Sequence, residues 1–309
     1  MTYRTLRLLP LFSAFALAPL GAGAADAPMA VAPLQLADRV FTFTNTMSNS
    51  LAVVGDDAVL LVDSGGSPEK ATQLRAAIAK LTDKPVRVLV DTHWHFDHVN
   101  GNEVFGTQGA TIVGHAAMRT RMRDSRAIEA LPNFPAVAYT REELATPAVT
   151  FDRTLTLHLG GQTVELVHPA TGCAHTDGDA VVYLPQRNIV VLGDLYFEGL
   201  YPFIDVAAGG SVDGMIAGCR EVLARIDDKT VVVPGHGPVT DKAHLEAFVA
   251  MLADINAKIA PLVAAGRTVE EVKAAKPTAA QDAVWGHGFL TPDQFTEIVY
   301  NGIAAQRKQ

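Results

Sequence analysis

Residues 91–100 read "DTHWHFDHVN" and place three histidines and an aspartate within six positions, from His93 to His98. They directly follow the apolar run "PVRVLV" at 85–90. A short and almost continuous apolar run of this kind is typical of a strand that is buried on both faces. The sequence therefore predicts a cluster of metal-competent side chains at the end of a buried strand, with any further metal ligands coming from other segments.

The segments around this cluster predict two series of strands, each followed by helices. The first series is expected to contain a strand at 36–45, a hairpin at 49–65 that turns at Asp56 and Asp57, and strands at 85–92 and 110–115, with helices at 67–81 and 116–128. The second is expected to contain strands at 149–159, 162–169, 179–185, 188–194 and 230–237, with helices at 211–226 and 240–264. Sheets and helices that recur in this order favour two β-sheets packed together with helices outside, a four-layer α/β arrangement in one domain.

The first 25 residues have the composition of a secretory signal peptide. Arg4 and Arg7 form a cationic start, residues 8–20 are apolar, and small residues surround a cleavage position after Ala24 or Ala25. A membrane anchor, the alternative, would need about 20 apolar residues. We therefore predict export to a bacterial periplasm, followed by a single domain at 26–309 in which residues 265–309 form a C-terminal helical extension.

The charge of the chain limits its possible partners, and its cysteine content limits the possible disulfides. The chain has a net charge of −8; removing residues 1–25 takes away two of its 25 basic residues, and 23 basic against 33 acidic residues leave −10. Without a basic run, nucleic acid and anionic membrane surfaces are unfavourable partners, so a small-molecule substrate is expected. Cys173 and Cys219 are too few for a disulfide framework. We expect two buried thiols, with a single bridge as the alternative.

Histidines and an aspartate near other strand ends supply the missing ligands. His93 and His95 are spaced i, i+2, which points both rings the same way in extended backbone. Three ligands per ion, with a position left for water, is the pattern of a catalytic zinc site. The residues thus predict two metal centres: one holds His93, His95 and His175; the other holds Asp97, His98 and His236; and the carboxylate of Asp194 bridges them.

The pattern His-x-His-x-Asp-His, a distal His, an Asp after Gly and the "PGHG" histidine resembles that of the metallo-β-lactamase superfamily, as does the hairpin ending in "LLVDSG". The resemblance covers nearly the whole chain after residue 25. It implies an αβ/βα sandwich of two mixed β-sheets with a dinuclear site, usually zinc, at one sheet edge. It also implies that Asp97 both binds metal and relays a proton, which makes it the candidate catalytic residue, and that Asp194 bridges.

Asp194 stands where most metallo-β-lactamases of this family have cysteine or serine. An aspartate there resembles thioesterases of the glyoxalase II type, lactonases and other broad hydrolases, although some lactam-cleaving relatives keep it. The expected activity is dizinc hydrolysis of a carbonyl-centred bond by a metal-bridging hydroxide. Two alternatives remain open: a mononuclear iron persulfide dioxygenase, and an exported metal-binding accessory protein without catalysis. Zinc is the expected metal, with iron or manganese as alternatives.

Several neighbours of these ligands have two readings. Asp63 either orients a ligand imidazole or caps its own turn. Each of the following either contributes to the site or is structural: Trp94, Phe96, His168, Cys173, Tyr196, Tyr201, Phe203, Gly209 and Gly210. Of these, the aromatic residues are candidates for the pocket wall, and the glycine pair is a candidate for presenting backbone N–H groups to a substrate carboxylate.

Overall fold

The computed structural model describes residues 30–124 and 143–307. The predicted signal peptide at 1–25 lies outside these residues, as does the end of the helix predicted at 116–128.

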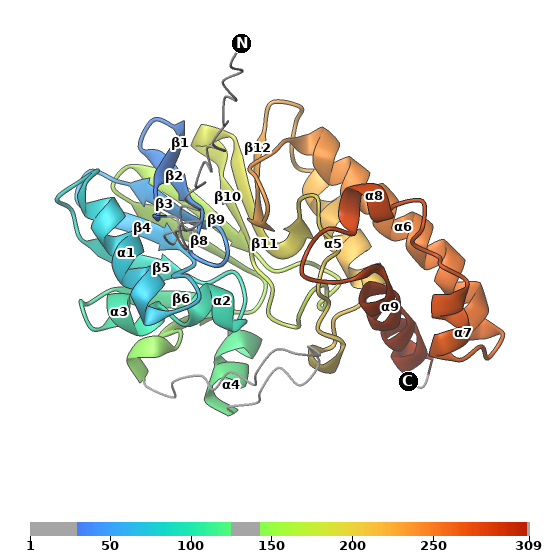
Figure 1. Ribbon diagram of the computed structural model, residues 1–309. Coiled ribbons are helices and arrows are strands. Elements are labelled where there is room, and N and C mark those ends of the chain that lie inside the picture. Colours follow the sequence, from blue (N-terminus) through green and yellow to red (C-terminus); the bar gives the residue numbers. More distant parts are fainter. Residues whose placement is uncertain (1–29, 125–142, 308–309) are drawn as a thin grey trace, which may run out of the picture.

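Two mixed sheets form the centre of the described chain (Figure 1). The first sheet is ordered β1 (Pro33–Ala37), β2 (Val40–Phe43), β3 (Ser50–Val54), β4 (Val59–Val62), β5 (Val86–Val90), β6 (Thr111–His115) and β7 (Val149–Phe151). The second is ordered β12 (Val231–His236), β11 (Ile189–Phe197), β10 (Val181–Leu184), β9 (Gln162–Val167) and β8 (Thr154–Leu159). Neighbours from β1 to β4 and from β8 to β11 are antiparallel, while β4 to β7 and β11 with β12 are parallel.

Helices cover the outer faces of both sheets. They are α1 (Pro68–Ala79), α2 (Phe96–Val99), α3 (Asn102–Gly106), α4 (Ala116–Asp124), α5 (Val212–Leu223), α6 (Lys242–Ala264), α7 (Val269–Ala274), α8 (Asp282–Trp285) and α9 (Pro292–Gln306). Short 3-10 turns lie at η1 (Glu143–Ala145), η2 (Pro185–Arg187) and η3 (Val206–Ala208). The N-terminal signals explain where the longer helices begin: Ser67, Ser211 and Asp241 cap α1, α5 and α6 through their side-chain oxygens.

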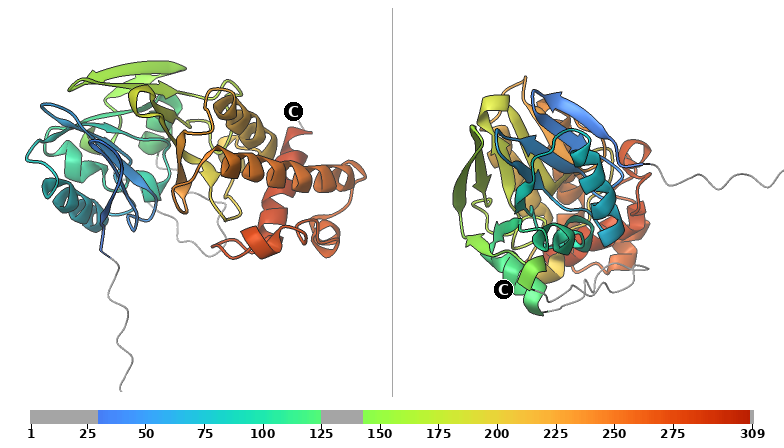
Figure 2. Two further views of the ribbon diagram at one scale, coloured as in Figure 1. Left: turned by 90° about the horizontal axis from the view of Figure 1, so that it is seen from above. Right: turned by 90° about the vertical axis from the view of Figure 1, so that its left-hand side faces the viewer.

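Three apolar clusters separate the four layers. Val62 and Val90 of the first sheet meet Val182 and Val191 of the second between the sheets. A second cluster joins the first sheet to α1 and α3, and a third joins the second sheet to α5, α6 and α9. Figure 2 shows the blue strands of the first sheet beside the yellow-green strands of the second, with α1 outside. The predicted sandwich of two mixed sheets with outer helices is therefore confirmed.

Two predicted strands are wrong. The stretch predicted as one strand at 36–45 turns at Asp38 and Arg39, between the antiparallel strands β1 and β2. The sequence predicts a continuous strand at 149–159, but the chain breaks at Asp152 and Arg153, so that β7 pairs with β6 in the first sheet and β8 pairs with β9 in the second. His115 contacts the carbonyl oxygen of Asp152 at this crossing, with Nε2 2.9 Å away. The alternating pattern continues through the crossing, so nothing in it reports the change of sheet.

The C-terminal helices pack onto the second sheet's side of the molecule. Val272, Trp285, Phe295 and Val299 belong to the same apolar cluster as α5 and α6. Within the described ranges, α6 alone is long and apolar enough to span a membrane by length and composition, with a mean hydropathy of 1.6 over its most apolar window. It packs against α5, α9 and the strands β11 and β12, as a core helix does.

Candidate metal centre

The seven predicted ligands come together where strands of the two sheets end. Their donor atoms form two groups of four, and the atoms of each group lie within 4.8 Å of one another. The first group consists of His93, His95, His175 and Asp194; the second consists of Asp97, His98, Asp194 and His236. Asp194 belongs to both, as the sequence predicts for a bridging carboxylate.

Local backbone structure differs from expectation at three ligands. Asp97 and His98 lie in the one-turn helix α2, with His95 as its N-cap, rather than in an open loop. Asp194 lies inside β11 rather than at its end, and the register of β11 against β12 shifts on both sides of Gly193, whose φ is +53°. Such a bulge re-aims the next side chain out of the regular alternation. The bulge therefore directs the side chain of Asp194 toward the candidate site from within a strand.

Asp194 also needs a glycine opposite it. A Cβ on Gly235, in the "PGHG" segment, would lie 2.1 Å from Asp194 Oδ1. The next residue, His236, is the last residue of β12. Asn49 fixes this strand end from the other sheet, because its side-chain amide donates to the carbonyl oxygens of Pro234 and Gly237 at 2.9 and 2.8 Å. The "PGHG" segment thus lets its backbone pass close to Asp194 and places His236 at the end of β12.

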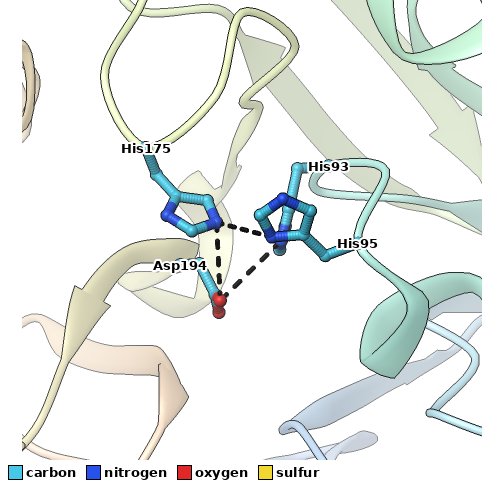
Figure 3. A group of neighbouring side chains, drawn as sticks. All are labelled: His93, His95, His175 and Asp194. Carbon is cyan, nitrogen blue, oxygen red and sulfur yellow. Dashed lines mark hydrogen bonds and ion pairs between the residues drawn. The ribbon is translucent and has the colours of Figure 1, made fainter. Parts of the chain in front are cut away.

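The first group points its nitrogen atoms at one oxygen of Asp194 (Figure 3). His175 Nε2 lies 3.6 Å and His93 Nε2 3.8 Å from Asp194 Oδ2, while His95 Nδ1 lies 2.9 Å from His175 Nε2. All four side chains are at most 5% exposed. His93 Nε2 is a buried nitrogen without a hydrogen-bond partner in the described part of the chain. Because buried polar atoms are normally paired, its position fits a metal ligand.

The second group surrounds the other oxygen of Asp194. His98 Nε2 lies 3.0 Å and His236 Nε2 3.3 Å from Asp194 Oδ1. Asp97 Oδ2 lies 3.0 Å from His236 Nε2 and 3.6 Å from His98 Nε2. The two carboxylate oxygens of Asp194 thus face different groups, which is the geometry that one carboxylate needs to serve two cations.

Electrostatics divides the histidines into two kinds. Burial, with the neighbouring imidazoles, lowers the pKa of His93 well below its ordinary value and also lowers the pKa of His175. Burial opposes a charge on His98 and His236 as well, but Asp194 and other carboxylates outweigh it. They raise the pKa of His98 well above its usual range and that of His236 to about 9. Neutral imidazoles are ready ligands, whereas a cation at the second group must displace protons.

The carboxylate of Asp194 stays ionised in this setting. Its burial favours the neutral acid, but His236, His98 and His93 together hold the pKa of Asp194 well below its ordinary value. A buried negative charge of this kind needs positive partners. Divalent cations would supply them in place of protons.

Further carboxylates hold the imidazoles in place. Asp63 accepts from His98 Nδ1 at 2.8 Å and from the backbone N–H of Thr92 at 2.8 Å, which leaves His98 Nε2 for the site. Of the two readings of Asp63, the structure favours the one in which it orients the imidazole of a candidate ligand. Its φ of +58° places it in a backbone conformation uncommon for a residue other than glycine. A partner on the far ring nitrogen fixes both tautomer and orientation of a ligating histidine.

Two supporting aspartates escape prediction from the sequence. Asp205 Oδ2 lies 3.1 Å from His95 Nε2, and Asp179 accepts from the backbone N–H of His175 at 2.7 Å. The one signal for Asp205 is that it caps the short η3 turn, which says nothing about His95. His175 is held further by its Nδ1, 2.8 Å from the carbonyl oxygen of Phe203.

The aromatic candidates divide between core and site. Tyr196 and Tyr201 are at most 1% exposed in the cluster with the C-terminal helices, so the structure favours the structural one of their two readings. Trp94 is also buried, beside Val99 and Met118. Phe203 remains close to the ligands, with its ring centroid 5.7 Å from that of His95, but it is only 4% exposed. Phe96 is half-buried against the Trp94 cluster.

The remaining candidates are structural. The backbone N–H groups of Gly209 and Gly210 donate to Val206 and Asp205, so neither is directed to a substrate. His168 stacks on His115 with centroids 4.0 Å apart. Both cysteines are free thiols; Cys219 is buried as predicted, whereas Cys173 is partly exposed.

The comparisons with known proteins agree with this geometry. The family model described as the metallo-beta-lactamase superfamily matches residues 43–236, the part of the chain that carries all seven candidate ligands. The chain belongs to the metallo-beta-lactamase superfamily. Its homologues include metallo-hydrolases, and its two His/Asp groups are suited to binding metal.

Two curated relatives and one solved structure illustrate the range of this superfamily. The 2,4-dinitroanisole O-demethylase subunit alpha of Nocardioides sp. is 28% identical over 64% of this chain and 55% of that protein, so the match spans about half of the relative's length. The type 2 metallo-beta-lactamase of Bacillus cereus is 26% identical over 64% of this chain and 70% of that protein. The metallo-beta-lactamase from Pontibacter korlensis is 24% identical, covers 72% of this chain and 99% of its own, and superposes with a TM-score of 0.60, which supports the fold.

Proposed function

We propose that the protein is an exported dinuclear zinc hydrolase that cleaves a carbonyl-centred bond in a small molecule: a β-lactam, lactone, ester or amide. One observation carries the proposal, namely two complete groups of donor atoms that share the two oxygens of Asp194. Three protein ligands besides the shared carboxylate leave room at each ion for water, the arrangement of a catalytic site.

Different residues would have different roles in such a reaction. Zinc ions held by the two groups would supply Lewis acidity and a water acidic enough to attack at neutral pH. Asp194 keeps its negative charge between the groups because the surrounding imidazoles hold its pKa low. Asp97 is the residue that carries a proton between solvent and site: its side chain is 14% exposed, against 5% for Asp194, and its Oδ2 lies beside His236.

The names of the relatives leave the scissile bond open. One relative is named for demethylating 2,4-dinitroanisole and another for cleaving β-lactams. A substrate panel should therefore contain nitrocefin, a lactone, an ester and a thioester, with 2,4-dinitroanisole as an ether for comparison. Turnover of the ether alone would overturn the carbonyl-centred part of the proposal.

Metal analysis and hydrolysis together test the proposal. Zinc-loaded, desalted protein should contain two zinc ions per chain by mass spectrometry of the metals and should turn over at least one carbonyl substrate. His95→Ala and His236→Ala should each lower the zinc content and abolish most of the turnover. His158→Ala, on the exposed side of β8, is the control and should change neither.

The same experiment separates the other functions. One iron per chain and no second ion would favour the mononuclear dioxygenase, although the complete group of Asp97, His98, Asp194 and His236 supports two ions. Two zinc ions without turnover of any substrate would favour a metal-binding accessory protein.

Export to the periplasm is proposed from the composition of residues 1–25, with Arg4 and Arg7 before the apolar segment at 8–20. Expression in a Gram-negative host, followed by fractionation and intact-mass measurement, tests it. Periplasmic protein that begins at Ala25 or Asp26 is expected; full-length protein retained in the cytoplasm would contradict the proposal.

A further inference from the structure

The C-terminal extension places an aromatic ring beside the second group of ligands. Phe289, in the segment between α8 and α9, has its ring centroid 6.5 Å from that of His236 and 6.2 Å from that of Phe197. Phe197 in turn stacks on His236, with centroids 5.0 Å apart and planes 16° apart. The rings of Phe197 from β11 and Phe289 from the extension therefore lie beside the imidazole of His236 in β12, a candidate metal ligand. Phe289 lies outside residues 43–236, so the match to the superfamily does not account for it.

Phe289 is held in place by the residues on both sides of it. Trp285 and Leu290 are buried, 6% and 2% exposed, in the cluster that joins the extension to α6. The backbone N–H of Tyr201 donates to the carbonyl oxygen of Trp285 at 2.9 Å, and the Tyr201 hydroxyl donates to Asp282 Oδ1 at 2.8 Å. In Figure 1 this segment is the red loop that joins α8 to α9. A ring anchored on both sides is a preorganised contact, because little conformational entropy is lost when a ligand binds it.

Phe289 itself remains 42% exposed despite these anchors. A second exposed apolar side chain, Met47 at 50%, belongs to a groove of about 420 Å³ that also contains Asn49, His236 and Pro238. His236 therefore lies beside the exposed ring of Phe289 and lines the same groove as the exposed side chain of Met47. Ligand sites typically combine apolar walls with a few polar groups that fix orientation. Here the candidate ligands supply the polar part, and Phe289 supplies apolar surface beside it.

We propose that Phe289 is a specificity-determining residue, whose ring binds an apolar or aromatic group of the substrate next to the second group of ligands. The inference rests on the proposed hydrolase function and adds the substrate class: a carbonyl compound with an apolar or aromatic substituent on the side of His236. A segment outside the shared fold would then select the substrate while the ligands within it supply the chemistry.

Two hydroxamic acids test this by binding alone, without turnover. Both present the same metal-binding group, but acetohydroxamic acid carries a methyl and benzohydroxamic acid a phenyl ring. Calorimetric titration of the zinc-loaded full chain should show tighter binding of benzohydroxamic acid. Phe289→Ala should weaken benzohydroxamic acid about two- to tenfold, the range of one aromatic contact, and leave acetohydroxamic acid unchanged. Phe289→Leu should restore part of the loss.

Val284→Ala is the matched control, since Val284 is a 62% exposed apolar residue of the same extension. It should leave both affinities unchanged. Equal affinity of Phe289→Ala and wild type for benzohydroxamic acid, or an equal loss for both probes, would overturn the role of Phe289 while the metal centre stands. Failure of both probes to bind the zinc-loaded wild type would overturn the metal centre, and this inference with it.

Discussion

The two groups of ligands differ in how far they are closed to solvent. His93, His95 and His175 are at most 3% exposed, whereas Asp97 and His236 have side chains that are 14% and 18% exposed. The first group is thus sealed within the protein, and the second forms the boundary between the site and its surroundings. For ions bound as proposed, we expect this asymmetry to favour retention of the ion at the first group and exchange with water, protons and substrate at the second.

The residues that hold the candidate ligands in place also differ between the two groups. His95 and His175 of the first group are held by Asp205 and by the carbonyl oxygen of Phe203. In the second group, His98 is held by Asp63, while Asp97 and His236 face each other across 3.0 Å. An ion at the first group therefore meets ligands already oriented by the protein, and preorganised ligands bind more tightly because less entropy is lost.

The largest effect is expected at Asp194, the residue that belongs to both groups. Asp194→Ala removes the carboxylate whose two oxygens each face one group, so both ions should be lost on dialysis. The value of kcat/KM should fall more than about 100-fold, which exceeds the loss typical of a residue that only orients a ligand. Metal analysis and hydrolysis of the best substrate measure this. Asp228→Asn, whose side chain is 95% exposed, should behave as wild type. Retention of one tightly bound ion in Asp194→Ala would show that the first group does not depend on the shared carboxylate.

Much of this site could be predicted from the sequence because its ligands are marked locally. The residues His93, His95, Asp97 and His98 lie within one short segment, and His236 lies in the recognisable "PGHG" segment at the end of an apolar strand. Asp205 has no such mark, because its partner His95 is 110 positions away and the contact exists only in the folded chain. Phe289 likewise lies beside His236 only because the extension packs onto α6.

Two further features could not be predicted for the same physical reason. Tyr196 and Tyr201 follow Asp194 closely, and an aromatic residue there reads the same whether it faces the site or the C-terminal helices. Tyr201 stacks on Phe295, with centroids 4.6 Å apart, which a local pattern cannot report. The split of the predicted strand at Asp152 has the same cause, since alternation of apolar residues does not identify the sheet that a strand joins.

A smaller effect is expected from the residues that orient the ligands, and it should be selective. Asp205→Asn should weaken the first ion about 10- to 100-fold and leave the second unchanged, whereas Asp63→Asn should do the reverse. Competition with a chromophoric chelator measures the two dissociation constants separately. Asparagine has only one acceptor oxygen and cannot accept from both the Thr92 backbone N–H and His98 Nδ1, so the Asp63 variant should lose stability as well, by about 1–3 kcal/mol. Equal weakening of both ions by either variant would contradict the independence of the two groups.

The last expected difference between the two groups is their response to pH. In the metal-free protein the pKa of His236 is about 9 and that of His98 is raised well above its ordinary value, so both imidazoles carry a proton at pH 7. An ion at the second group must displace protons, and its affinity should rise about tenfold per pH unit for each proton displaced, up to about pH 9. His93 and His175 have lowered pKa values and carry no such proton.

Chelator competition at several pH values between 6.5 and 8.5 compares the two groups directly. The more weakly bound ion should gain affinity steeply with pH, and the more tightly bound one should gain less. His236→Gln removes one protonated imidazole and should flatten the steep profile by about one proton per ion, because glutamine takes up no proton in this range. Parallel profiles for both ions would mean that the protons are shared through Asp194, and the two groups would then titrate as one centre rather than as a sealed site beside an open one.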